Sequence, residues 1–497
     1  MLLLFILMAA LSVIFLAKVS KNGKNQPFCP PPGPKGLPLI GNLHQFEPSN
    51  THVYYSKLGK TYGPIFALRL MSKPMVVIQS AKLAQEIFQT HDKNFCNRPM
   101  LAGTKKLSYN GLDVAFSPYS DYIREMKKIL IVHLLNSKKV ESFAPIRQEE
   151  VSRLIQEVSS LSSASKIVNL SQLVLSFASS TSGRIAFGKR YDDDSVLGRR
   201  YYSLLHEAEA MFTGFFYTDY VPFGGFLDMI TGKSSKLEKT FKDLNALLEK
   251  IINEHLHKNK LESTKDDMVD VLLRLMNDTS FPYKLTMNHI KAILMNLFVG
   301  GANTTTAGVI WIIAELIKNP IPMKKVQEEL RCVAQNKGCI LEDDLPKLEY
   351  FKAVIKETIR LHPPAPLLVP HETVEKSVIE GYDILPNTMV IINAWVIGRD
   401  PKCWKDSKIF MPERFIGSSV ELKGREMMPM YPFGGGRRMC PAYTFGLVNL
   451  ELVLANLLYS FDWELPNGLN KEEIDSNVLP GIVMHKEKQL CLVAKKF

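Results

Sequence analysis

Residues 431–440 have the sequence Tyr431-Pro432-Phe433-Gly434-Gly435-Gly436-Arg437-Arg438-Met439-Cys440, a glycine-rich loop that ends in a single cysteine. Glycine allows positive φ values and close backbone contacts. Apolar residues recur with helical period over 443–458, so a helix would begin just after Cys440 and point its N-terminal dipole at the thiol. That dipole, with neighbouring cations such as Arg437 and Arg438, would lower the thiol pKa. The loop presents either a reactive thiolate or, as is commoner for a lone cysteine, a buried inert thiol.

The composition allows a large buried core, because 46% of the 497 residues are hydrophobic. Lysine plus arginine, 61, exceed aspartate plus glutamate, 50, by 11, which suits an anionic membrane surface or an acidic protein partner. The basic residues are dispersed and no zinc-finger or RNA-motif spacing occurs, so we expect no nucleic-acid partner. The seven cysteines are scattered and contain no Cys-x-x-Cys pair, which favours a reducing compartment over a disulfide framework.

The N-terminus carries the signal of a membrane anchor. Residues 2–17 are almost wholly apolar and long enough to cross most of a bilayer core, and Lys18, Lys21 and Lys24 follow directly. No small-residue cleavage site follows, so we predict a retained transmembrane anchor over 1–24 with the rest of the chain on the cytoplasmic side. A stiff proline-rich hinge over 25–41 would then lead to one globular domain, 42–497.

The globular part is predicted to be mainly α-helical with small β-sheets. Helical periodicity dominates over 120–135, 151–161 and 237–256, whereas strand patterns occur at 65–70, at 75–78 and between 377 and 394. The run 211–217 crowds aromatic residues around a glycine. It forms either ordinary core or the lining of a hydrophobic ligand cavity or membrane contact.

The longest predicted helix spans about 286–318 and is apolar on all sides, so it must be buried or cross a membrane. Its centre, Gly300 to Thr306, contains two glycines and three threonines, which are poor helix formers. This sequence predicts either a kink at a close helix crossing or a locally opened turn that offers hydroxyl and amide groups to a bound molecule.

A further helix over 351–361 places Glu357 and Arg360 on one face among apolar neighbours. Buried charges must be paired and further hydrogen-bonded, so this pair calls for a third partner. The spacing alone is weak, because Glu150/Arg153 and Glu328/Arg331 repeat it.

Four motifs occur together in one order: the glycine-threonine segment 300–306, Glu357-x-x-Arg360, Pro412-Glu413-Arg414-Phe415 and the loop 433–440. In this combination the chain resembles a cytochrome P-450, a haem-thiolate monooxygenase of the plant microsomal type, from the anchor to the C-terminus. Residues 479–485 resemble those of plant relatives that include aldoxime-metabolising enzymes.

The resemblance implies a P-450 fold with haem b held by Cys440 as the axial ligand of iron, and Glu357, Arg360 and Arg414 as a buried structural network. It also implies that Phe433 and Gly434 belong to the haem-binding loop. The cations expected at the haem propionates are Arg438, His371, either Arg124 or Lys127, and Arg98.

The chain departs from the family pattern at several of these positions. Ile123 and Lys127 stand where relatives have tryptophan and arginine, so we expect weaker haem retention, because a bidentate fork is replaced by a point charge. Asn303 precedes Thr304 where an acid is common, and an amide cannot titrate. Thr304, Asn303 and Cys440 are the expected catalytic residues, with protons reaching dioxygen through the Thr304 hydroxyl from solvent or another group.

The implied function is oxidation of a small hydrophobic specialised metabolite with O2 and electrons from NADPH, delivered by a separate flavoprotein reductase at the endoplasmic reticulum membrane. By position, the substrate chamber would be lined by 101–114, 212–217, 300–304, 365–369 and 481–483. Three alternatives remain: a reductase-independent enzyme that rearranges or dehydrates an oxygenated substrate, a non-catalytic membrane-tethered haem or lipid binder, and a secreted glycoprotein with sequons at Asn169, Asn277 and Asn303.

Overall fold

The computed structural model describes residues 28–47, 49–190, 196–257, 266–280, 283–335, 337–422 and 429–497. The predicted anchor, 1–24, and the first residues of the predicted hinge lie outside these ranges.

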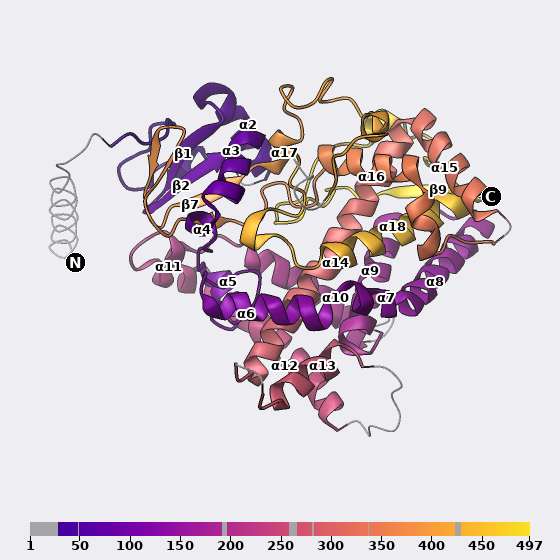
Figure 1. Ribbon diagram of the computed structural model, residues 1–497, viewed down its shortest axis with the longest axis horizontal. Helices are drawn as coiled ribbons and strands as arrows, with labels where there is room; N and C mark the ends of the chain where they lie inside the picture. The colour runs from indigo at the N-terminus through magenta and orange to yellow at the C-terminus, as the bar shows by residue number, and fades with distance from the viewer. Residues whose placement is uncertain are drawn as a thin grey trace.

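Helices form the body of the molecule (Figure 1). Their bounds are α2 Thr51–Tyr62, α3 Ala81–Gln85, α4 Asp92–Phe95, α5 Ala102–Leu107, α6 Asp121–Ile129, α7 Ser137–Ser142, α8 Ala144–Ser163, α9 Leu170–Phe187, α10 Val196–Phe212, α11 Gly224–Ile230, α12 Lys233–Leu256, α13 Met268–Asn277, α14 Met287–Lys318, α15 Pro320–Ala334, α16 Glu349–Leu361, α17 Ala394–Ile397 and α18 Tyr443–Ser460. A π-helical turn, η3 (Leu130–Leu134), extends α6, and a 3-10 turn, η6 (Pro412–Phe415), carries the Pro-Glu-Arg-Phe motif. The prediction of a mainly helical chain is confirmed.

The strands form three small sheets in the described part of the chain. Their bounds are β1 Ile65–Leu70, β2 Lys73–Ile78, β3 Val168–Asn169, β4 His371–Glu372, β5 Ser377–Ile379, β6 Tyr382–Ile384, β7 Met389–Ile392, β8 Phe461–Glu464 and β9 Cys491–Lys496. The sheet orders are β1-β2-β7-β4, β3-β9-β8 and β5-β6. The first sheet lies at the opposite end of the molecule from α8 and α15 (Figure 1).

The strands β1 and β2 were predicted with a turn at 72–74, and the structure places this turn slightly earlier. β2 begins at Lys73, and Met71 takes a φ of 52° to reverse the chain. The proline-rich residues 28–41 pack along this sheet: the amide of Ala67 donates to the Pro32 carbonyl at 2.7 Å, and Arg69 Nη2 donates to the Leu37 carbonyl at 2.6 Å.

The long helix α14 runs through the centre of the core. Among the described helices it is the one long and apolar enough to cross a membrane, but 72% of its most apolar window is buried inside the protein. It is therefore a core helix. The predicted opened turn is absent, because α14 is continuous through 300–306. The hydroxyls of Thr304, Thr305 and Thr306 each donate to the carbonyl four residues earlier, at 2.8, 3.2 and 2.9 Å, which keeps them within the helical turn.

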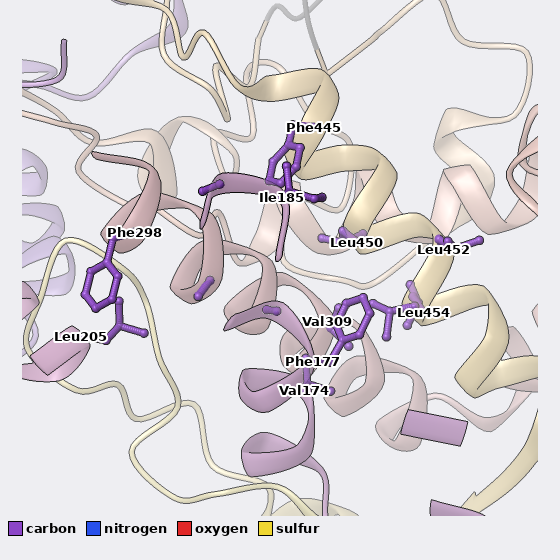
Figure 2. Close-up of a cluster of buried hydrophobic side chains, with 14 of the residues drawn as sticks. Val174, Phe177, Ile185, Leu205, Phe298, Val309, Phe445, Leu450, Leu452 and Leu454 are labelled. Carbon is purple, nitrogen blue, oxygen red and sulfur yellow. The ribbon is translucent and has the colours of Figure 1, made fainter. Parts of the chain in front are cut away.

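The glycines of α14 instead allow close helix crossings, which was the other predicted reading. A Cβ on Gly301 would lie 2.8 Å from the Ser182 hydroxyl of α9, and one on Gly308 would overlap Leu450 of α18. Figure 2 shows buried side chains that gather where these helices meet, including Phe177 and Val309. The crossing fixes the position of α18, whose first turn follows Cys440.

Candidate cofactor site

The loop 431–440 is closed on itself by backbone geometry. The amide of Cys440 donates to the Phe433 carbonyl at 3.0 Å, and Gly434 and Gly436 have φ values of 71° and 60° that side chains rarely adopt. A Cβ on Gly435 would lie 2.5 Å from the ring of Phe88, so only glycine allows the loop to lie against that ring. The glycines thus fix where Cys440 is presented.

The protonation of Cys440 differs from the sequence-based expectation. Burial raises the thiol pKa, and the backbone amide of Ala442 and the charge of Lys127 offset only part of that rise. Arg437 and Arg438 were expected to lower this pKa, but both point elsewhere. Arg437 forms an exposed ion pair with Asp92 at 2.5 Å, and Arg438 donates to backbone carbonyls. A bound metal ion would favour the thiolate, because a thiol that coordinates a metal loses its proton.

Three predicted haem-binding residues converge in a buried cluster near the loop. Arg438 Nε donates to the Cys96 carbonyl at 2.7 Å, and Arg98 Nη1 donates to the Val369 carbonyl at 2.6 Å. His371 Nδ1 lies 2.8 Å from the Phe95 carbonyl. Burial and the like charge of Arg438 lower the pKa of Arg98 to about 9, and burial with the charge of Arg98 lowers the pKa of His371 well below its ordinary value.

The two predicted cations of α6, Arg124 and Lys127, point in different directions. Lys127 Nζ donates to the carbonyls of Arg437 and Met439 at 2.8 Å each, so it braces the Cys440 loop. Arg124 lies on the exposed side of α6 and pairs with Asp121. The prediction that Arg124 joins the cluster is therefore not supported by its position. Ile123 is 3% exposed and packs in the core.

The donor set fits a doubly anionic cofactor. Among the described residues, no carboxylate forms an ion pair with Arg98, Arg438 or Lys127, whose hydrogen bonds go to carbonyl oxygens. Arg98 and Arg438 repel each other, and the charge of the buried Asp113 offsets the cost of their burial only in part. The two propionates of haem would supply that counter-charge, and the Cys440 sulfur is the ligand type that haem-thiolate iron requires.

The predicted buried network is present in full. Glu357 and Arg360 are both fully buried, with Arg360 Nε 2.7 Å from Glu357 Oε2. Arg414 of η6 is the third partner, because its Nε donates to Glu357 Oε1 at 3.1 Å. Arg360 Nη1 also donates to the carbonyls of Gly398 and Ser407. The network ties α16 to the segment that leads into the Cys440 loop.

The two other pairs with the same spacing have different partners. Glu150 accepts from Arg184 at 2.8 Å, whereas Glu328 lies 3.8 Å from Lys324 on an exposed face. Arg331 pairs with Asp462 at 2.8 Å. The i, i+3 spacing alone therefore does not identify an ion pair. The apolar neighbours of Glu357 and Arg360 distinguish that pair from the other two.

The predicted catalytic residues of α14 differ in their surroundings. Gly300 is exposed and has open space beside its Cα, and Thr304, one turn later, is half-buried. Asn303 is fully buried, and its Nδ2 donates to Glu209 Oε2 of α10 at 2.7 Å. Its burial inside a core helix argues against glycosylation there. Glu209 was not predicted as a site residue, because no spacing or motif in the sequence relates it to Asn303.

Several segments predicted to line the substrate chamber meet in space. Phe212 stacks on Phe116 with ring centroids 4.8 Å apart, and a Cβ on Gly103 would lie 3.3 Å from the Phe216 ring. The amide of Met484 donates to the Pro364 carbonyl at 2.8 Å. The aromatic run 211–217 thus packs against α5 and the segment that follows it, and its Phe212 and Phe216 are buried core residues.

Comparisons with known proteins agree with this geometry. The sequence profile of the family described as Cytochrome P450 matches residues 31–493. The chain is 45% identical to 6,7,8-trihydroxycoumarin synthase of Pastinaca sativa over 475 residues, covering 94% of this chain and 93% of that protein. It is 42% identical to strychnine-11-hydroxylase of Strychnos nux-vomica, covering 93% and 91%.

A solved structure has the same fold. The zebra fish cytochrome P450 determined with abiraterone aligns with a TM-score of 0.74 at 23% identity, covering 90% of this chain and 99% of that one.

Proposed function

The chain belongs to the cytochrome P450 family, and we propose that it is a haem-dependent monooxygenase that oxidises a small hydrophobic specialised metabolite. Electrons would come from NADPH through a separate flavoprotein reductase. The observation that carries the proposal is Cys440, which is held in a closed glycine loop beside buried and half-buried cations that form no ion pair with a carboxylate among the described residues. The names of two relatives, a trihydroxycoumarin synthase and a strychnine hydroxylase, support hydroxylation as the reaction.

The residues assigned to haem are Cys440 for the iron and Arg98, Arg438, His371 and Lys127 for the propionates. Haem supplies dioxygen binding and cleavage, and thiolate ligation favours breaking of the O–O bond. Lys127 has a second task, because its hydrogen bonds to Arg437 and Met439 hold the backbone just before Cys440. Phe433 and Gly434 shape the same loop.

Proton supply in this proposal depends on Thr304. Its hydroxyl now donates to the Gly300 carbonyl, and a hydroxyl can exchange that bond for one to water or substrate oxygen. Asn303 cannot give up a proton at neutral pH and its amide is bound to Glu209. Asn303 therefore acts by position, and the proton would come from solvent beside the exposed Gly300 or from another group.

We further propose the endoplasmic reticulum as the location, with the predicted anchor 1–24 in the membrane, a hinge over 25–41 and the domain 42–497 facing the cytosol. The net charge of +11 supports contact with an anionic membrane surface or an acidic reductase.

The test is product formation by the full chain with a plant NADPH–cytochrome reductase and a metabolite panel. We expect oxidation that requires NADPH and O2, and Thr304→Ala should release more peroxide per product than the matched variant Thr305→Ala. Turnover of a hydroperoxide without NADPH would instead support a rearranging enzyme. Absence of ligand-stimulated NADPH consumption across the panel would support a haem or lipid binder.

A further inference from the structure

A buried polar cluster joins three segments above the glycine-threonine part of α14. It consists of Glu209 of α10, Asn303 of α14 and His485 of the C-terminal loop. Asn303 Nδ2 donates to Glu209 Oε2 at 2.7 Å, and His485 Nε2 lies 3.7 Å from the same oxygen. Asn303 is fully buried, and the side chains of Glu209 and His485 are 12% and 20% exposed. The proposed monooxygenase chemistry leaves Glu209 and His485 without a role.

Each member of the cluster has a buried atom with unused hydrogen-bonding capacity. Glu209 Oε1, Asn303 Oδ1 and His485 Nε2 are all buried, and none of them has a hydrogen-bond partner. Buried polar atoms are almost always paired in folded proteins, because an unpaired one costs free energy. Glu209 Oε1 and Asn303 Oδ1 are acceptors. His485 Nε2 donates or accepts according to its tautomer, but it forms no hydrogen bond with either oxygen, so both acceptors are left for a donor from outside the cluster.

The cluster borders the predicted substrate chamber. Glu209 lies one turn before Phe212, and Asn303 directly precedes Thr304. Gly481 lies beside the unpaired oxygen, since a Cβ on Gly481 would be 3.5 Å from Glu209 Oε1. Because Gly481 has no side chain, its own Cβ does not contact this buried oxygen.

The groups near Glu209 that can carry positive charge are the histidines His485 and His206, and no ion pair joins Glu209 to a lysine or arginine among the described residues. The ion pair that Glu209 forms among the described residues is with His485, at 3.7 Å and only when that histidine is protonated. The nearby Glu207, by contrast, is held by Arg200 at 3.0 Å. A buried carboxylate without a lysine or arginine attracts a donor, and a cationic donor most strongly.

We propose that Glu209 and Asn303, beside His485, form a binding site in the chamber wall for a hydrogen-bond donor on the substrate, either a hydroxyl or a protonated amine. The inference rests on the proposed function for the identity of the chamber, and it names the substrate class. The substrate is then a mainly apolar molecule that carries at least one donor, and Glu209 is a specificity-determining residue.

The experiment measures the affinity of the haem-loaded full chain for three probes on one scaffold, without reductase or NADPH. The probes are 7-methylcoumarin, 7-hydroxycoumarin and 7-(aminomethyl)coumarin, and equilibrium dialysis gives each Kd. A charge-assisted hydrogen bond should make at least one donor probe bind about tenfold to a hundredfold more tightly than the methyl probe. The stronger of the two donor probes distinguishes a hydroxyl from an ammonium substrate.

Two variants test the assignment by different routes. Glu209→Gln keeps the shape but removes the charge, so the preference for the donor probe should fall about tenfold while affinity for the methyl probe stays unchanged. Gly481→Ala keeps the charge and places a methyl group against Oε1, and should reduce the same preference. Glu207→Gln, two residues away and bound to Arg200, is the matched control and should leave all three affinities unchanged.

Equal affinity of the wild-type protein for all three probes would overturn the proposal. An equal loss of affinity for all three probes in Glu209→Gln would also overturn it. That result would mean that the Glu209–Asn303 hydrogen bond only stabilises the packing of α10 against α14. In the separate assay with reductase and NADPH, a rise in peroxide release by Glu209→Gln with unchanged affinities would assign Glu209 to proton supply instead. The affinities are measured without turnover, so they test the binding site whether or not the protein is a monooxygenase. Failure of the monooxygenase proposal would appear separately, as a lack of NADPH-dependent product in the reductase assay.

Discussion

Replacing Glu357 by glutamine tests whether the buried network holds the fold together. Glu357 accepts from Arg360 Nε at 2.7 Å and Arg360 Nη2 at 2.8 Å, from Arg414 Nε at 3.1 Å and from the amide of Met411 at 2.8 Å. Glutamine keeps the size and one acceptor oxygen. It removes the carboxylate charge that balances Arg360 and Arg414, and it turns an NH2 group toward a guanidinium donor.

The expected cost is large. Breaking a fully buried ion pair by changing one partner costs about 3–5 kcal/mol, and the remaining acceptor places Glu357→Gln near the lower end, about 3 kcal/mol. Since domains are stable by only about 5–15 kcal/mol, this loss takes a large share of the total. About 3 kcal/mol corresponds to a population of unfolded protein roughly a hundredfold higher.

The assay is urea denaturation followed by tryptophan fluorescence, with the haem spectrum recorded on the same samples. Glu328→Gln is the control, because its partner Lys324 is 3.8 Å away and the two side chains are 63% and 81% exposed. We expect the control to change stability by no more than about 0.5 kcal/mol. A loss of unfolding free energy below about 1 kcal/mol for Glu357→Gln, or one equal to that of the control, would refute the argument that burial makes this ion pair important for stability.

Three further predictions concern other parts of the chain. Lys127→Met should speed haem loss, measured by transfer to apomyoglobin, while Lys127→Arg should slow it; equal rates would remove Lys127 from the site. Gly435→Ala should lower the haem content of purified protein, because its Cβ would lie 2.5 Å from the Phe88 ring. Burial lowers the pKa of His255, but hydrogen bonds to Asp267 and to a backbone carbonyl outweigh it and raise the pKa overall, so the charged pair stabilises at low pH and is lost as pH rises above the folded pKa. His255→Gln should therefore lower Tm more at pH 6 than at pH 8, and an equal loss at both would contradict this sign.

The sequence predicted the parts of the site that local patterns encode. The helix after Cys440, the helix that carries Glu357 and Arg360, and the need for a third partner all follow from periodicity and from the cost of burying charge. Arg414 then supplied that partner. These features depend on residues that are close in sequence, or on a motif whose position in the fold the family resemblance implies.

Features that depend on how side chains point in the folded protein, or on contacts between distant segments, could not be predicted from local patterns. Helical period alone did not show that Arg124 faces solvent while Lys127, three residues later, reaches the loop. Poor helix propensity at 300–306 suggested an opened turn, but packing against α9 and α18 keeps α14 regular, because tertiary contacts outweigh propensities of about 1 kcal/mol. Glu209 and Asn303 are 94 positions apart, and no local pattern connects them.

The central claim is that Cys440 binds haem iron through its sulfur. The most direct measurement is the absorption spectrum of the reduced protein treated with carbon monoxide, for the wild type and for Cys440→Ser. We predict the red-shifted band of thiolate-ligated haem in the wild type and its absence in Cys440→Ser. A histidine-type spectrum in the wild type, or a red-shifted band that persists in Cys440→Ser, would contradict the assignment.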